Sequence, residues 1–406
     1  MTARCIIVGA SHAAGQLVVS LRQSGWIGEI VLIGDEPHAP YHHPPLSKDY
    51  LSGVKEAGEL LIRPVESYEA ADITLRLGTR VSSIDREAQT VTTSAGELIS
   101  YTKLVLATGA RVRKLPIKGA DLSGVYYLRD MQDVTRIKKA LEHAERAVII
   151  GGGYIGLETA ASLSKLGLSV TVMEAAPRIL QRVTAPELSS FYKRIHTEEG
   201  VTIVENAIAD QIQQDESGLE VIDKEGGRYR ADFIVIGIGV IPNIELAAEA
   251  GLECANGIVV NEYCQTSDEN IYAAGDVTWH YNPQYKTHLR LESVPNATEQ
   301  AKIVASHICG KPKAYDSLPW FWSDQFDLKL QIAGLSQGYD DLIIRGDIEG
   351  SRSFAAFYFK GRQLIAVDAV NAPREFAMSR MVLTKKGTLA KDKIGDKAIA
   401  IKDAMI

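Results

Sequence analysis

Apolar runs separated by glycine-rich turns make residues 147–174 the most regular part of the chain. Residues 147–150 are apolar, as in a buried strand, and the turn GGGYIG follows directly. A helix is predicted next, ending at Gly167, from apolar residues at helical spacing: Ile155, Ala160, Leu163 and Leu166. A second apolar strand, 170–173, then ends at Glu174. The order strand, glycine turn, helix, strand predicts a βαβ unit that binds a dinucleotide.

The residues of this turn match that chemistry one by one. Gly151 makes the tight turn, Gly153 lets backbone amides approach a pyrophosphate, and Gly156 allows the helix to pack closely on the strand. The N-terminus of the helix offers free N–H groups and a positive dipole end to the phosphates. Glu174 can accept hydrogen bonds from both ribose hydroxyls, whereas a 2′-phosphate would meet its negative charge. We therefore expect NAD(H) rather than NADP(H).

A looser copy of this unit opens the chain. Residues 5–8 predict a strand, the turn GASHAA follows, a helix reaches about Gly25, and the strand 30–33 ends at Asp35. Ser11 and Ala14 replace strict glycines but are small enough to keep the backbone close to a ligand. Two such units predict two dinucleotides, a bound FAD and an exchangeable nicotinamide nucleotide.

Residues 90–116 and 220–243 share one plan, which indicates a duplicated domain. In each, short strands turn at Ala95-Gly96 or Gly226-Gly227 and lead to a buried strand, 104–107 or 233–236, that ends in glycine.

A further predicted strand, 271–274, carries Gly275 and Asp276 at its carboxyl end, where open α/β sheets bind ligands. We expect helix-forming sequence after Asp276. The carboxylate therefore either holds a ribityl hydroxyl or caps a helix.

From residue 318 the pattern changes to short strands, at 329–333, 341–345, 354–359 and 364–368, with helix at the end. The predicted fold is α/β, with two Rossmann-like nucleotide-binding domains and a β-rich α+β C-terminal domain. The expected boundaries are 1–112 with 246–317 for a discontinuous FAD-binding domain, 113–245 for the NAD-binding domain, and 318–406 for the C-terminal domain.

Composition narrows the class of protein. The 406 residues are 46% hydrophobic and 23% charged, with a net charge of −7 that argues against general affinity for nucleic acid. No apolar run approaches the roughly 20 residues of a membrane span. The first strand begins by Cys5, which leaves no room for a signal peptide, so we expect a cytoplasmic enzyme.

The four cysteines form no C-x-x-C pair and no iron–sulfur ligand set, so the protein's own thiols are not expected to carry electrons. The pair His42-His43 has no supporting carboxylate or thiol cluster, and we expect no metal site. In the segment PPLSK that follows, Lys48 taken alone suits a solvated surface loop, and Ser47 suits the cap of a helix.

Specific motifs extend over nearly the whole chain: PPLSK (44–48), ATG (107–109), GGGYIGLE (151–158), RVTAP (182–186), GD (275–276), ESVPNATEQA (292–301) and PWFWSDQ (319–325). Together they resemble the glutathione-reductase-like flavoproteins. Within them the chain is most similar to the NADH-dependent ferredoxin reductases of bacterial oxygenase systems. Rubredoxin reductase and apoptosis-inducing factor are more distant relatives.

The resemblance implies FAD contacts at Gly9, Ser11, Ala13, Ala14, Asp35, Pro45, Lys48, Val81, Ala107, Thr108, Gly109, Arg129, Gly275, Asp276, Val294 and Trp322. It implies NADH contacts at Gly151, Gly153, Tyr154, Ile155, Gly156, Glu158, Glu174, Arg182 and Gly239. It also implies three catalytic residues. Lys48 lies near flavin N5 and pairs with Glu158, and Tyr154 lies by the flavin ring.

The activity so implied is hydride transfer from NADH to FAD, then single-electron delivery to an external [2Fe–2S] ferredoxin that serves a cytochrome P450 or a Rieske-type oxygenase. Such ferredoxins are typically acidic and dock transiently. Residues 374–406 hold eight Lys or Arg against four Asp or Glu, either as a solvated face or as a docking surface. The candidate docking residues are Arg290, Lys302, Arg380, Lys385 and Lys386.

Three alternatives remain open at this stage. A rubredoxin reductase would use the same cofactors with another acceptor. A dithiol or peroxide-reducing flavoenzyme is disfavoured because no cysteine follows Asp35 closely. An NADH-sensing protein like apoptosis-inducing factor is disfavoured by the complete PWFWSDQ segment and the compact C-terminus. By resemblance we expect a monomer or a weak homodimer.

Overall fold

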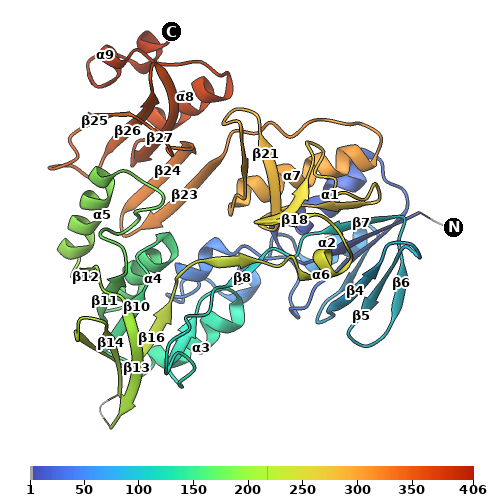
Figure 1. The fold of residues 1–406 in the computed structure, drawn as a ribbon, viewed down its shortest axis with the longest axis horizontal. Coiled ribbons are helices and arrows are strands. Elements are labelled where there is room, and N and C mark those ends of the chain that lie inside the picture. Colours follow the sequence, from blue (N-terminus) through green and yellow to red (C-terminus); the bar gives the residue numbers. More distant parts are fainter. Residues whose placement is uncertain (1–2, 217) are drawn as a thin grey trace. The chain divides into compact units, whose positions relative to one another are not determined.

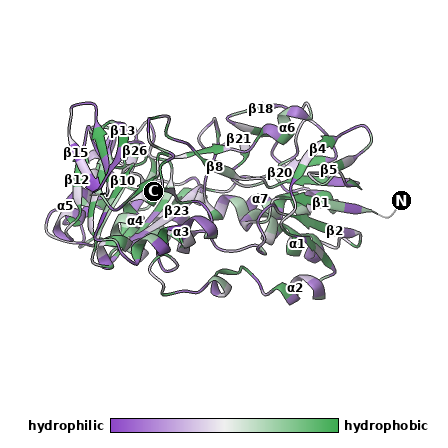
Figure 2. Cartoon of the chain, turned by 90° about the horizontal axis from the view of Figure 1, so that it is seen from below, coloured by the Kyte–Doolittle hydropathy of each residue, from purple (hydrophilic) through white to green (hydrophobic). Residues whose placement is uncertain are grey.

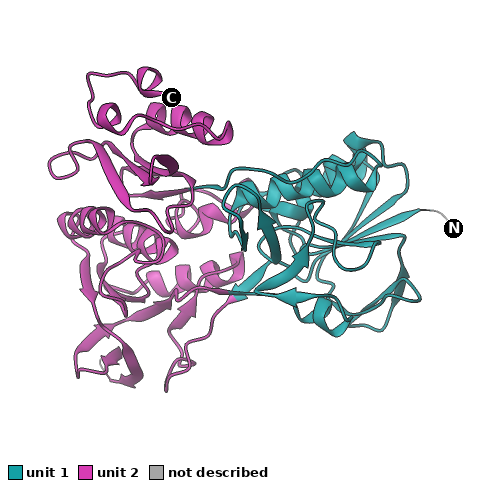
Figure 3. Cartoon of the chain, turned by 45° about the horizontal axis from the view of Figure 1, so that its top comes forward, with its two compact units in different colours: residues 1–42, 60–111, 241–321 teal, residues 43–59, 112–240, 322–406 magenta. Residues whose placement is uncertain are grey.

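The structure is a computed structural model that describes residues 3–216 and 218–406 (Figure 1). The chain forms two compact units (Figure 3). Unit 1 comprises residues up to 42, 60–111 and 241–321, and unit 2 comprises 43–59, 112–240 and 322–406. Each unit is therefore assembled from three separate stretches of the sequence.

Unit 1 contains a five-stranded parallel sheet with the order β20 (Ile271–Ala273), β7 (Lys103–Leu106), β1 (Arg4–Val8), β2 (Glu29–Ile33) and β3 (Ile73–Arg76). One smaller sheet contains β4 (Val81–Asp85), β5 (Thr90–Thr93) and β6 (Leu98–Ser100). Another contains β18 (Cys254–Ala255), β19 (Gly257–Val260), β21 (Thr278–Asn282) and β22 (Thr287–Leu289). The helices are α1 (His12–Ser24), α2 (Val65–Ala70), α6 (Glu245–Glu249) and α7 (Val294–Ile308).

Strand β1 is buried on both faces, which explains its uninterrupted apolar run. Cys5 and Ile7 face a core that includes residues of α1 and α7, whereas Ile6 and Val8 face a second core on the other side. This alternation follows from the two-residue period of a strand. Figure 2 shows the hydrophobic colouring along the strands of this sheet.

Unit 2 repeats the parallel sheet with the order β12 (Thr202–Glu205), β11 (Ser169–Glu174), β10 (Arg146–Ile150), β16 (Phe233–Ile236) and β9 (Val125–Tyr127). Beside it lies the sheet β13 (Ala209–Asp215), β14 (Gly218–Asp223) and β15 (Arg228–Ala231). Its helices are α3 (Met131–Leu141), α4 (Tyr154–Lys165) and α5 (Pro186–Glu198). Short 3₁₀ helices are η1 (Pro44–Ser47) and η2 (Ala57–Leu60).

The C-terminal part has a five-stranded sheet with the order β23 (Trp320–Gln325), β24 (Leu328–Gly334), β27 (Gln363–Val370), β26 (Phe354–Lys360) and β25 (Asp341–Gly346). It ends in α8 (Pro373–Thr384), α9 (Lys391–Ile394) and η3 (Ile401–Ala404). The chain passes between the units five times: between His42 and His43, within η2, and within β8 (Ala110–Val112), β17 (Val240–Pro242) and β23. Among the described residues, no helix is both long and apolar enough for a bilayer crossing.

These elements confirm the predicted α/β class with its β-rich end. Both βαβ units form, and the hairpins β5–β6 and β14–β15 turn at the predicted glycines. Two local predictions are wrong. Strand β21, not a helix, follows Asp276, and Ser47 is the last residue of η1 rather than the cap of a helix. The predicted three-domain boundaries stay an expectation.

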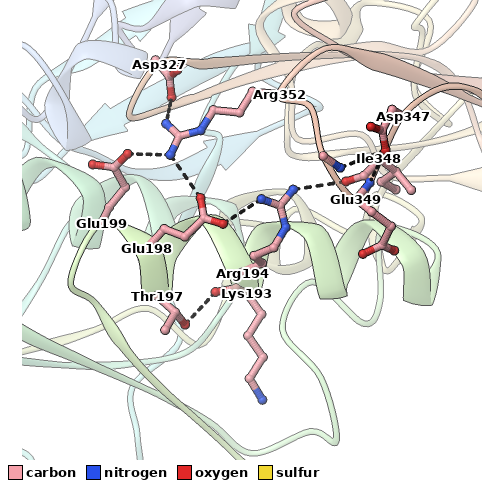
Figure 4. A network of polar contacts seen from close by, with 11 residues as sticks. Lys193, Arg194, Thr197, Glu198, Glu199, Asp327, Asp347, Ile348, Glu349 and Arg352 are labelled. Atoms are coloured by element: carbon pink, nitrogen blue, oxygen red, sulfur yellow. Dashed lines mark hydrogen bonds and ion pairs between the residues drawn. The ribbon is translucent and has the colours of Figure 1, made fainter.

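A network of ion pairs in unit 2 joins the end of α5 to the segment between β25 and β26 (Figure 4). Arg352 contacts Glu199 at 2.8 Å, Asp327 at 2.6 Å and Glu198 at 3.4 Å. Arg194 contacts Glu198 at 2.8 Å and donates to the carbonyl of Ile348 at 3.1 Å. Because the Arg352 guanidinium contacts three carboxylates, we expect its removal to lower the free energy of unfolding by more than the loss of a single surface ion pair would.

We predict that Arg352→Ala lowers Tm by about 2 °C at low ionic strength, because exposed ion pairs contribute modestly and salt screens them. The measurement is thermal unfolding at low salt and in 1 M NaCl, where we expect most of the difference to disappear. Arg362→Ala is the control, because Arg362 is exposed and forms no ion pair among the described residues. An equal loss at both salt concentrations would contradict the assignment.

Candidate active site

The turn between β10 and α4 has the geometry of a phosphate cradle. Gly151 has φ +120°, and a Cβ there would lie 2.4 Å from the carbonyl oxygen of Gly237. A Cβ at Gly156 would lie 2.0 Å from the carbonyl oxygen of Gly151. Gly153, the N-cap of α4, has no atom within 4 Å of its Cβ position, so the helix N-terminus faces open space. The turn therefore fits a pyrophosphate held by backbone amides.

Glu174 ends β11 and lies against this turn. Its Oε2 accepts the N–H of Gly152 at 2.8 Å, and its Oε1 accepts the N–H of Ala176 at 2.7 Å. These bonds hold the carboxylate in one orientation, and each oxygen keeps a second lone pair for a ribose hydroxyl. The guanidinium of Arg182 lies 3.9 Å from the Cβ position of Gly239, so two further predicted NADH contacts lie together. Ile155 is exposed, and Tyr154 is half-buried beside it on α4.

In unit 1, the predicted FAD contacts gather at one edge of the parallel sheet. Asp35 follows β2, Gly9 follows β1, residues 107–109 follow β7, and Gly275 with Asp276 follows β20. Since these neighbouring strands are parallel, their carboxyl ends meet at the same edge. Ser11 is the N-cap of α1, and Ala13 and Ala14 lie in its first turn. The edge fits a second dinucleotide.

Two amide side chains that the sequence did not single out stabilise this edge. Thr108 donates from Oγ1 to the carbonyl of Asn243 at 2.9 Å, and Asn243 donates from Nδ2 to the carbonyl of Thr108 at 2.8 Å. Gln300 accepts the N–H of Gly275 through Oε1 at 2.8 Å. Gln300 belongs to the quoted segment ESVPNATEQA, but nothing in the local pattern indicated a bond 25 residues away.

The other predicted contacts have these positions: Pro45 in η1, Val81 buried at the start of β4, Arg129 just before α3, Val294 as the first residue of α7, and Trp322 half-buried on β23. Their roles toward FAD stay predictions.

The predicted pair of Lys48 and Glu158 forms. Nζ of Lys48 lies 2.6 Å from Oε2 of Glu158, whose side chain is only 6% exposed, and Nζ also donates to the carbonyl of Pro44 at 3.1 Å. Ser47 donates to Oε2 at 2.6 Å. Ser323 donates to Oε1 at the same distance of 2.6 Å. The two serines were missed as site residues, although each lies inside a quoted motif.

A second buried carboxylate, Asp368 on β27, lies in the same unit. Its Oδ2 accepts the hydroxyls of Tyr358 at 2.6 Å and Thr184 at 2.9 Å, and Oδ1 finds no donor among the described residues. Burial raises the pKa of Asp368 to about 6. Burial and then the Asp368 charge raise the pKa of Tyr154 well above its usual value. Asp368 could not be predicted from the sequence, because a single acid on an apolar strand has no local pattern that marks it as buried.

The thiols are unsuited to redox chemistry. All four are free, and Cys5 and Cys264 are buried. Burial raises the pKa of Cys5 to about 12 and raises the pKa of Cys254, Cys264 and Cys309. They therefore stay protonated at neutral pH. Within the described part of the chain, no group of three or more His, Cys, Asp or Glu side chains is arranged to hold a metal ion.

Comparison with known proteins agrees with this geometry. The sequence profile of the pyridine nucleotide-disulphide oxidoreductase family matches residues 3–301, and that of the reductase C-terminal domain matches 320–405. The chain is 42% identical to putidaredoxin reductase from Pseudomonas putida, over 98% of this chain and 96% of that protein. It is 41% identical to rhodocoxin reductase from Rhodococcus erythropolis, over 98% and 94%. The crystal structure of a covalent putidaredoxin reductase–putidaredoxin complex matches with a TM-score of 0.95 at 41% identity, covering 99% of this chain and 98% of that one.

We predict that Asp368→Asn stabilises the protein at pH 8 by on the order of 2 kcal/mol and much less near pH 4. The pKa of Asp368 is raised in the folded state, so its stabilising contribution is present below about pH 4 and is lost as the pH rises through about 6. The amide keeps one acceptor oxygen and carries no charge at any pH. Denaturant unfolding across this range is the measurement, with exposed Asp392→Asn as the control. If the difference in free energy of unfolding between Asp368→Asn and wild type did not change with pH, the raised pKa of Asp368 would be refuted.

Proposed function

Because this chain belongs to the pyridine nucleotide-disulphide oxidoreductase family, we propose that it is an NADH-dependent ferredoxin reductase of an oxygenase system. The ion pair of Lys48 with the buried carboxylate of Glu158 is the structural observation that supports the proposal. A lysine and a carboxylate from distant segments are brought together in a unit that also contains an intact dinucleotide turn. Two relatives that match over nearly the full length are named as a putidaredoxin reductase and a rhodocoxin reductase.

The two dinucleotide sites and the Lys48–Glu158 pair have separate roles in this proposal. When bound, FAD would supply the conversion of a two-electron hydride donor into one-electron deliveries. The amides at the N-terminus of α4 would hold the NADH pyrophosphate, and Glu174 would bind the adenosine ribose. Lys48 provides a fixed positive charge, oriented by Glu158, where negative charge develops on reduction. The chain's own role is binding, orientation and electrostatics.

An external acceptor suits the thiol chemistry. A dithiol-type relative would need a reactive thiolate, whereas burial raises the pKa of every cysteine in this chain. With no reactive thiolate in the chain to receive them, electrons from bound FAD would pass to an external acceptor. A [2Fe–2S] ferredoxin accepts one electron at a time and is the acceptor we propose, in service of a cytochrome P450 or a Rieske-type oxygenase.

For docking we propose the basic end of α8, where Arg380, Lys385 and Lys386 are exposed. These charges favour an acidic ferredoxin and an association that weakens with salt. Lys302 is exposed and pairs with Glu299, whereas the side chain of Arg290 is only 11% exposed and pairs with Glu292; both belong to unit 1 rather than to the end of α8. We further propose a cytoplasmic monomer or weak homodimer.

The proposal is tested by cytochrome c reduction with NADH, with and without added [2Fe–2S] ferredoxins of bacterial oxygenase systems. We expect at least one acidic ferredoxin to raise the rate about tenfold or more, and the stimulation to fall with ionic strength. Fast bleaching of the flavin by NADH without stimulation by any of them would refute the ferredoxin assignment. Slow bleaching would favour an NADH-sensing protein instead.

We also predict that Glu174→Arg shifts nucleotide preference from NADH toward NADPH, because a cation replaces the carboxylate that faces the 2′ position. The ratio of kcat/KM for the two nucleotides should change by about tenfold or more. The mutation also removes the hydrogen bonds that Glu174 accepts from Gly152 and Ala176, and any resulting loss of activity should affect both nucleotides and cancel in the ratio. An unchanged ratio would overturn the ribose assignment.

A further inference from the structure

The two oxygens of the Glu158 carboxylate have different partners. Oε2 accepts Ser47 Oγ and Lys48 Nζ, both at 2.6 Å. Oε1 accepts only Ser323 Oγ among the described residues, also at 2.6 Å. Glu158 is 5% exposed and Ser323 is 1% exposed, so water does not readily replace this donor. Removing the Ser323 hydroxyl would therefore leave one oxygen of a buried anion without a hydrogen bond.

Ser323 is in turn held by two further buried side chains. Because Ser323 must donate its only proton to the carboxylate, its Oγ accepts from Nε2 of Gln325 at 3.2 Å. The amide oxygen of Gln325 then faces Nε2 of His196 at 2.9 Å, so this nitrogen must be the donor. Burial lowers the pKa of His196 to about 4, which keeps the ring neutral, and the bond to Gln325 then requires its single proton on Nε2. Three donors thus point in series toward Glu158.

The elements explain why this series is well ordered. Ser323 and Gln325 are two residues apart on β23 and therefore share its buried face. His196 lies on α5 and Glu158 on α4, and Ser162, one turn after Glu158, donates to the carbonyl of Ser47 at 2.7 Å. Hydrogen bonds that point the same way polarise one another and strengthen the series.

We propose that Ser323, supported by Gln325 and His196, is a positioning residue that holds the Glu158 carboxylate, and through it Lys48, in place for flavin reduction. The inference rests on the proposed function, in which Lys48 faces the flavin. It deepens that function, because the first strand of the C-terminal sheet, β23, then acts in the reduction of the flavin by NADH.

The test compares Ser323→Ala with Ser323→Thr, which keeps a hydroxyl, and with Lys48→Met as reference. In stopped-flow reduction by NADH we expect Ser323→Ala to lower the limiting rate about 3- to 10-fold with little change in the apparent Kd for NADH. We expect the midpoint potential of the bound flavin, measured by spectroelectrochemistry, to move in the same direction as in Lys48→Met. Ser323→Thr should restore most of both properties.

Ser379→Ala is the matched control, since Ser379 is fully buried in the same unit and its hydroxyl has no partner among the described residues. We expect it to change neither the rate nor the potential. Gln325→Leu should show a smaller effect in the same direction as Ser323→Ala, because it acts one hydrogen bond further away.

A double-mutant cycle shows whether Ser323 acts through Glu158. In a Glu158→Gln background we expect Ser323→Ala to have almost no further effect on rate or potential. A full additive effect, or a Ser323→Ala variant that matches wild type in both readouts, would overturn the proposal. All these measurements use only NADH and the bound flavin. Failure of ferredoxin to stimulate turnover would therefore refute the proposed function and leave this test intact.

Discussion

The burial of the Glu158 charge is the constraint on which unit 2 depends. A buried carboxylate is costly unless its hydrogen-bonding capacity is filled, and its partners come from separate parts of the chain. Ser47 and Lys48 come from 43–59, Glu158 itself from 112–240, and Ser323 from 322–406. These are the three stretches that make up the unit. The Glu158 carboxylate, which we propose orients Lys48 for flavin reduction, thus also joins the three segments of unit 2.

The two βαβ units share a close approach of the glycine turn to the neighbouring strand but differ in the acid that follows their second strand. A Cβ at Gly9 would lie 2.0 Å from the carbonyl oxygen of Ala107, and a Cβ at Gly151 would lie 2.4 Å from that of Gly237, so both turns require glycine. In the βαβ unit of residues 147–174, the Glu174 carboxylate accepts a hydrogen bond from the turn itself, at Gly152. In the N-terminal βαβ unit, the corresponding Asp35 is exposed and its carboxylate lies 3.9 Å from the Arg80 guanidinium. A preformed acid in one unit and an exposed one in the other suit two different dinucleotides.

Unit 2 carries two buried titratable groups with opposite dependence on pH. The contribution of Asp368 to stability is present below about pH 4 and is lost as the pH rises through about 6. Burial lowers the pKa of His196 to about 4, so its contribution is present above its usual pKa of about 6.5 and is lost as the pH falls. The two windows overlap and partly offset each other.

The sequence by itself determined the strands of the two βαβ units, the glycine turns, both hairpins and Glu174 at the end of β11, because period, turn chemistry and spacing are local properties. Resemblance to a family was needed to pair Lys48 with Glu158, since no local pattern joins these segments. Only the tertiary structure decided the hydrogen bonds of Ser323, Asn243, Gln300 and Asp368, and it has β21 where a helix was expected after Asp276. Hydrogen bonds between distant residues depend on how strands and helices pack, and packing distances are not written in any single stretch of the chain.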